Sequence, residues 1–172
     1  MPNHVVNEIV FENVNWFQKR KILKKVVKNG HIDFEILVPS PLNIWRGNVG
    51  KEHEETFPDN HLDWARKNWG TKWNAYESET IKFCNTLTIR FRTAWSPPYG
   101  WIIALFNYFN LPFSLLWMSE GDDKAFYETY TPVKDDWEEP WVRKEASIVQ
   151  TKYAHKLLWG VEEFEDDEIS NT

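Results

Sequence analysis

The chain has 172 residues, a formal net charge of −6, one cysteine and an aromatic fraction of 16%. This length fits one domain that can bury a core without metal or disulfide staples, and a single cysteine cannot form an internal disulfide. The longest apolar run, Trp101 to Phe106, is far shorter than the roughly 20 residues needed to span a bilayer, which excludes a transmembrane helix. No stretch near the start has the pattern of a signal peptide, so we expect a soluble protein in the reducing cytoplasm.

Most of the net charge comes from the C-terminal end of the sequence. Removing the acids found there from the total of 26 leaves as many acids as the 20 bases, so the body is electrically balanced. This balance argues against a DNA mimic or a general polyanion-binding surface and directs attention to local patches. We expect residues 161–172 to form an acidic, disordered tail. Its acids are Glu162, Glu163, Glu165, Asp166, Asp167 and Glu168.

The first part of the chain predicts a strand, a helix and a second strand. Apolar and polar residues alternate from His4 to Phe11 and again from His31 to Val38, as expected of strands. Asn15 to Asn29 predicts a helix, with Asn15 as its cap and Gly30 just beyond its end. Residues 39–80 are expected to form an insertion. It contains an irregular loop with three prolines and then a short helix over residues 60–68.

The next elements complete a second strand–helix–strand unit. Thr86 to Thr93 alternates strictly, Pro97 and Pro98 begin a helix that runs to about Phe109, and Phe113 to Met118 is a short strand. Two such units in succession are the split βαβ pattern of ferredoxin-like domains. The predicted fold is therefore α+β and ferredoxin-like, with an insertion between the two halves.

Two elements are expected after this unit. Ala125 to Tyr130 is predicted as an edge strand, and Trp141 to Trp159 as a long helix that Gly160 ends. We expect residues 1–160 to form a single domain.

The open face of the predicted sheet does not resemble an RNA-binding surface. Ferredoxin-like domains that bind single-stranded RNA stack bases on aromatic residues of this face. Here the alternation of the third strand leaves Arg90 and Arg92 on the open face, where we expect them to pair with Asp33 and Glu35.

The first helix carries a cluster of bases that can contact phosphates or an acidic partner. Like charges four residues apart, such as Lys21 and Lys25, weaken a helix slightly. The cluster is either a solvated face or a binding patch. The candidate patch consists of Lys21, Lys24, Lys25 and Lys28.

The sequence contains no recognisable catalytic or metal-binding motif. His53, His61 and Asp63 lie in an acidic region, but their spacing matches no ligand template. Cys84 stands at a strand entrance, where a buried, inert thiol is expected. We therefore expect no metal, no cofactor and no catalytic residue.

The most distinctive stretches are Asn68 to Tyr76, with the sequence Asn-Trp-Gly-Thr-Lys-Trp-Asn-Ala-Tyr, and Thr93 to Pro98. In a structural interpretation, tryptophans of the first stretch close one end of the core. In a functional interpretation, indole edges and a cation form a contact surface, as at many protein interfaces. The candidate binding residues are Asn3, His4, Asn7, Trp69, Lys72, Trp73, Asn74 and Trp95.

These stretches, the opening Met-Pro-Asn-His-Val and Glu120-Gly121 resemble the YubB-like proteins of bacteriophages and plasmids, over roughly residues 1–130. The resemblance implies a ferredoxin-like domain and a mobile-element origin, but no reaction. It leads us to expect a non-enzymatic accessory protein that binds a host or phage macromolecule, most simply a protein, in host takeover or counter-defence. Two alternatives are a nucleic-acid-binding protein that uses the basic helix, and a small enzyme or nucleotide-binding module around the Asn, His and Trp motifs.

Overall fold

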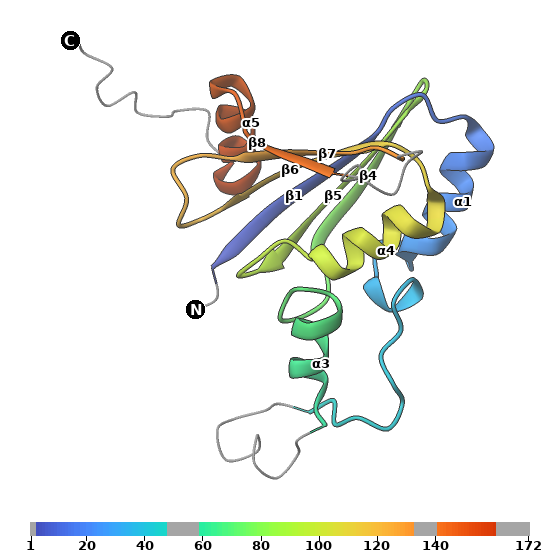
Figure 1. The fold of residues 1–172 in the computed structure, drawn as a ribbon. Coiled ribbons are helices and arrows are strands. Elements are labelled where there is room, and N and C mark those ends of the chain that lie inside the picture. Colours follow the sequence, from blue (N-terminus) through green and yellow to red (C-terminus); the bar gives the residue numbers. More distant parts are fainter. Residues whose placement is uncertain (1–2, 48–58, 133–140, 161–172) are drawn as a thin grey trace.

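The computed structural model describes residues 3–47, 59–132 and 141–160 (Figure 1). Its strands are β1 (His4–Phe11), β2 (Val27–Lys28), β3 (His31–Ile32), β4 (Tyr76–Phe83), β5 (Thr86–Ala94), β6 (Phe113–Ser119), β7 (Phe126–Tyr130) and β8 (Trp141–Glu145). Its helices are α1 (Trp16–Val26), the 3-10 helix η1 (Phe34–Ile36), α3 (His61–Asn68), α4 (Tyr99–Phe109) and α5 (Ile148–Trp159). No helix in these described ranges is long and apolar enough to cross a membrane.

Six strands form one antiparallel sheet in the order β4-β5-β1-β6-β7-β8. The four strands β4-β5-β1-β6, with α1 after β1 and α4 after β5, have the ferredoxin-like arrangement. The α+β, ferredoxin-like prediction is therefore confirmed. β7 and β8 extend the sheet beyond β6.

The two faces of the sheet bury different clusters of side chains. One face packs against α1 and α4 through residues such as Ile9, Ile89 and Trp101, all fully buried. The opposite face carries a smaller cluster in which Val6 packs with Ala154 and Leu158 of α5. Figure 1 shows α5 at the far side of the sheet from α4. The face that ferredoxin-like domains commonly leave open is thus partly covered.

The predicted strand over residues 31–38 is wrong beyond Ile32. Phe34 begins the 3-10 helix η1, and its ring packs against Trp69 and Trp101 in the core. The second ferredoxin-like strand is instead β4, which begins within the predicted insertion and ends at Phe83, just beyond it. This strand was missed because it lies at the sheet edge and its pattern is mostly exposed, so it carries a weak hydrophobic signal.

The predicted helix over residues 141–159 is wrong in its first part. Residues 141–145 form β8, which pairs with β7, and the helix α5 begins only after Ser147. Ser147 and Gln150 form a reciprocal capping box, which is the local signal for this start. The predicted tail, the histidine at position 53 and much of the predicted loop lie outside the described residues.

The charge pairing on the second face also differs from the prediction. Arg90 pairs with Glu8 and Glu79, and Arg92 pairs with Glu77. Asp33 and Glu35 do not take part, because the segment that carries them leaves the sheet.

Candidate functional site

Four distant parts of the chain meet where β1 begins and β5 ends. The backbone N–H of Trp95 donates to the carbonyl of Asn3 (2.9 Å), and the backbone N–H of His4 donates to the Glu120 carboxylate (2.9 Å). The His4 ring is hydrogen-bonded through Nδ1 to the hydroxyl of Tyr76. Thr71 Oγ1 donates to the Ala94 carbonyl (2.9 Å) and Ser96 Oγ donates to the Gly70 carbonyl (2.6 Å), so the chain just before Lys72 is tied to the segment around Trp95. We call this part of the molecule the tryptophan end. It comprises Asn3, His4, Lys72, Trp73, Tyr76, Trp95 and Glu120.

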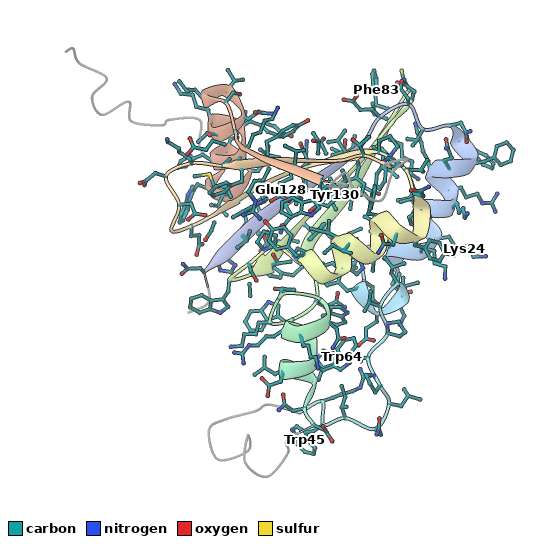
Figure 2. The ribbon with its side chains drawn as sticks, in the orientation of Figure 1. Lys24, Trp45, Trp64, Phe83, Glu128 and Tyr130 are labelled. Atoms are coloured by element: carbon teal, nitrogen blue, oxygen red, sulfur yellow. The ribbon has the colours of Figure 1, made fainter. Side chains whose placement is uncertain are left out.

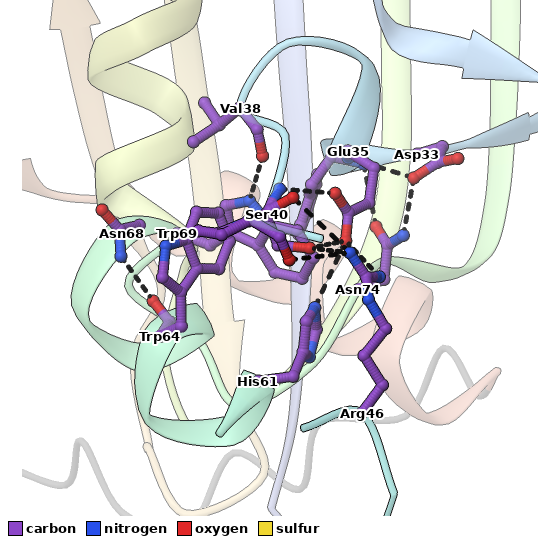
Figure 3. A network of polar contacts seen from close by, with 12 residues as sticks. Asp33, Glu35, Val38, Ser40, Arg46, His61, Trp64, Asn68, Trp69 and Asn74 are labelled. Atoms are coloured by element: carbon purple, nitrogen blue, oxygen red, sulfur yellow. Dashed lines mark hydrogen bonds and ion pairs between the residues drawn. The ribbon is translucent and has the colours of Figure 1, made fainter. Parts of the chain in front are cut away.

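Trp69 belongs to the core rather than to this surface. Its side chain is fully buried, and its Nε1 donates to the carbonyl of Val38 at 2.9 Å (Figure 3). Its ring makes edge contacts with Phe34 and Trp64. The structural interpretation therefore holds for this tryptophan.

Asn74 holds the η1 segment in place (Figure 3). Its Oδ1 accepts from the backbone N–H of Phe34 (2.9 Å), and its Nδ2 donates to Asp33 (2.7 Å). Asn7 is fully buried, and its Nδ2 donates to Thr93 Oγ1 (2.9 Å). The Asn74 amide and the Asn7 Nδ2 are thus used within the fold, while Asn7 Oδ1 is buried without a hydrogen-bond partner among the described residues.

Trp73 and Trp95 face solvent, with 37% and 56% of their surface exposed. The Lys72 ammonium lies 5.1 Å from the ring centre of Trp73, a cation–π contact. Trp95 has a φ of 73°, a left-handed conformation that is rare for a bulky residue. Asn3, Trp73 and Trp95 are therefore the exposed residues of the tryptophan end, and the half-buried Lys72 lies beside Trp73.

Tyr76 is neutral at physiological pH. Burial raises the pKa of its hydroxyl to about 12, and Glu77 and Glu120 add to this shift while Arg92 opposes it. A tyrosine with such a pKa acts as a hydrogen-bonding group here, not as a base.

The acidic and histidine residues of the insertion form a structural network (Figure 3). Glu35 accepts hydrogen bonds from the Ser40 backbone and hydroxyl and lies 3.3 Å from both Arg46 and His61. Burial alone would raise the pKa of Glu35, but the Ser40, His61 and Arg46 contacts outweigh it and hold the pKa below its ordinary value. Within the described residues no group of three or more candidate ligands could hold a metal ion.

The four lysines of the predicted basic patch have different neighbours. Lys25 lies over the ring of Tyr108 at 5.0 Å, and Lys28 lies 3.8 Å from Asp33. Lys21 is exposed, and only Lys24 lines a groove between α1 and the turn that joins β4 to β5.

This groove was not predicted as a unit, because it combines helix residues with a distant turn. Its volume is about 730 Å³. Cys84 lies exposed on its wall, so the prediction of a buried thiol is wrong; the residue occupies a turn with a φ of 43°. We call this feature the basic groove. It is lined by Trp16, Lys19, Arg20, Leu23, Lys24, Lys82 and Cys84.

A second polar cluster missed by sequence reasoning surrounds Glu128, which is fully buried (Figure 2). Its carboxylate accepts from Arg143 Nε (2.7 Å) and from the hydroxyls of Tyr99 (2.8 Å) and Tyr130 (2.9 Å). Burial and the neighbouring carboxylate raise the pKa of both tyrosines, which stay neutral donors. The Arg143 guanidinium also lies near four aromatic rings, so the cluster fastens β8 to the sheet.

Comparison with known families supports the fold. A family model described as the ferredoxin-like domain in Api92-like protein matches residues 68–135. The match includes the segment around Trp69, the segment around Trp95 and the strands through β7, and it ends before β8 and α5. No curated protein and no solved structure matches the chain significantly. The fold and this match define a ferredoxin-like α+β protein.

Proposed function

We propose that this protein is a non-enzymatic accessory protein of a phage or plasmid, related to the YubB-like proteins. In the cytoplasm of the host it binds a host or phage protein through the tryptophan end, in host takeover or counter-defence. The observation that carries the proposal is the presentation of Trp73 and Trp95 to solvent beside Lys72. Exposed tryptophans and a neighbouring cation are typical anchors of protein interfaces.

The backbone at Trp95 supports a contact role. A left-handed conformation costs a non-glycine residue about 1–2 kcal/mol, and such strain gathers at functional sites. Here the strained backbone places a large ring in solvent, so in the free protein no burial of the ring offsets the strain. Burial of the ring against a partner would offset it.

The hydrogen bonding of the tryptophan end favours binding over catalysis. His4 Nδ1 is bonded to Tyr76, and the Tyr76 hydroxyl in turn donates to the Thr93 carbonyl at 3.2 Å. The raised pKa of Tyr76 keeps it protonated at neutral pH. These groups hold the surface in shape.

The test compares partner capture from a host lysate by the wild type and by the double variant Trp73→Ala/Trp95→Ala. Trp141→Ala is the matched control, because Trp141 is 37% exposed, as Trp73 is, and its register across β7 and β6 places it beside the end of β1 that lies opposite His4. We expect a partner that the wild type and the control retain and the double variant loses, with purified partner showing at least a tenfold weaker affinity. An identical set of partners for all three folded proteins would refute a contact role for the tryptophan end.

A further inference from the structure

The basic groove has a charge that contrasts with that of the whole chain. The chain carries a formal net charge of −6. Of the described residues that line the groove, four are cations and none is a carboxylate. Lys19 donates to the Cys84 carbonyl, so Arg20, Lys24 and Lys82 remain to meet an anion. Clustered charges in a concave site focus the local field and attract anions whatever the net charge.

The walls of the groove are held together by hydrogen bonds. The backbone N–H of Val14, just before α1, donates to the Asn85 carbonyl at 2.8 Å. The Asn85 side chain donates to Asn13 at 2.9 Å, and Lys19 spans to Cys84. The turn between β4 and β5 is therefore fixed against the start of α1. A site fixed in this way loses little entropy when it binds a ligand.

Large aromatic rings stand in and around this groove. Trp16 lines it and is 61% exposed, and its ring makes an edge contact with Phe17 at 5.0 Å. The guanidinium of Arg20 lies 5.4 Å from the ring centre of Trp16. Phe83, at the tip of the β4–β5 hairpin in Figure 2, is 70% exposed. Aromatic rings beside a cationic groove form the stacking platform on which unpaired bases bind.

We propose that the basic groove binds single-stranded nucleic acid, with Arg20, Lys24 and Lys82 on the phosphates and Trp16 against a base. The bases of a duplex are stacked on one another and cannot reach Trp16, so a single strand fits better.

This site is separate from the surface through which ferredoxin-like domains usually bind RNA. That face is partly covered here by α5, where Tyr153 donates to Glu8 at 2.7 Å and Arg92 donates to the Leu158 carbonyl at 2.9 Å. The basic groove also lies at the opposite end of β5 from Trp95. The inference therefore goes beyond the proposed function, and each surface can be tested while the other is intact.

The first test measures the affinity of the full chain for labelled twelve-residue oligo-dT and oligo-rU by fluorescence anisotropy. We expect Lys24→Glu/Lys82→Glu to weaken binding at least tenfold. Lys67→Glu/Lys144→Glu is the control, because it changes the net charge equally through exposed lysines of α3 and β8. With three phosphates neutralised, the logarithm of the affinity should fall with that of the salt concentration with a slope of about −2.

Trp16→Ala separates base stacking from charge. We expect it to weaken oligo-dT binding about tenfold while leaving the binding of an abasic oligonucleotide of the same length unchanged. Equal affinity of the wild type for oligo-dT, the abasic strand and polyglutamate would overturn the assignment, because it would show a general anion groove. Preference for a duplex of the same length would overturn it as well.

Alkylation of Cys84 tests where the ligand binds without any substitution in the chain. It is the single cysteine of the chain and lies exposed on the groove wall, so its alkylation by N-ethylmaleimide reports access to the groove. Saturating oligo-dT should slow this alkylation several-fold in the wild type and in Trp73→Ala/Trp95→Ala. Unchanged alkylation with oligonucleotide bound, equal loss of affinity in both charge-reversal variants, or no binding at low salt would each refute the proposal.

Discussion

The two ends of β5 present aromatic residues in different ways. Next to the tryptophan end, Trp69 is buried in the core and hydrogen-bonded to Val38, while Trp73 and Trp95 are exposed. At the basic groove, Trp16 and Phe83 are exposed on a helix start and a hairpin tip, while Phe11, the register partner of Leu87 at the same end of β5, is fully buried. The comparison shows that aromatic content alone does not indicate function, because identical residue types serve as core, as contact surface or as groove wall.

The largest expected effect comes from Trp69. Trp69→Ala should lower the free energy of unfolding by about 3–5 kcal/mol, because it leaves a cavity between η1, α3 and α4. Phe83→Ala at the other end should change it by less than about 0.5 kcal/mol, because that ring is exposed. Urea denaturation of both variants measures the difference. Similar losses for the two would contradict the distinction between a core ring and a surface ring.

The next largest effect on stability is expected from the substitution of Asn74, compared with that of Asn85. Asn74→Ala should cost about 1–3 kcal/mol, because it leaves the partly buried N–H of Phe34 without its acceptor. Asn85→Ala at the basic groove removes a hydrogen bond between exposed side chains and should cost less than about 1 kcal/mol. Thermal unfolding followed by circular dichroism measures the loss of stability in both variants. A larger loss for Asn85→Ala than for Asn74→Ala would contradict the prediction.

A smaller difference in stability is expected between two variants that test the backbone strain at Trp95. Trp95→Gly and Trp95→Ala remove the same ring contacts, but only glycine adopts a φ of 73° without steric cost. We expect the glycine variant to be more stable than the alanine variant by about 1 kcal/mol, although both lose the partner. Chemical denaturation of the pair measures this difference. Equal stability would show that the backbone at Trp95 is unstrained.

The smallest effect concerns Tyr76 and pH. Its pKa of about 12 in the folded chain exceeds the ordinary value of about 10, so the unfolded chain loses this proton first as the pH rises. The associated stability is complete below pH 10 and is lost between about pH 10 and 12. The wild type should therefore lose stability relative to Tyr76→Phe in this window, by a small amount because the group is partly exposed. Parallel pH profiles would show that the hydroxyl is not shifted.

Sequence patterns predicted β1, β5, α4 and β6, and the cap at Asn15 is confirmed with its capping box. Burial alternates along most of β5, whereas β1 is buried at most positions because the second face of the sheet also carries a cluster with α5. Residues 34–36 misled the prediction, because Phe34 is buried by tertiary contacts with Trp69 and Trp101 that no local pattern reveals.

The surfaces were predictable only in part. Composition singled out the segment around Trp69, but not which of its tryptophans would be buried. The basic groove forms because Lys82 and Cys84 lie beside α1, which is about 60 residues earlier in the chain. The cluster around Glu128 needs an arginine from a later strand. Contacts of this kind are set by topology.

The ion pair between the buried Glu128 and the partly exposed Arg143 also determines how β8 can add to the sheet. All five residues of β8 are exposed, so hydrophobic burial gives this strand little preference for one alignment over another. A slip by one residue would turn Arg143 to the other face and leave the Glu128 carboxylate buried without its cation, at a cost of several kcal/mol. A single charge pair therefore sets the register of the last strand, and through it the position from which α5 reaches back across the sheet.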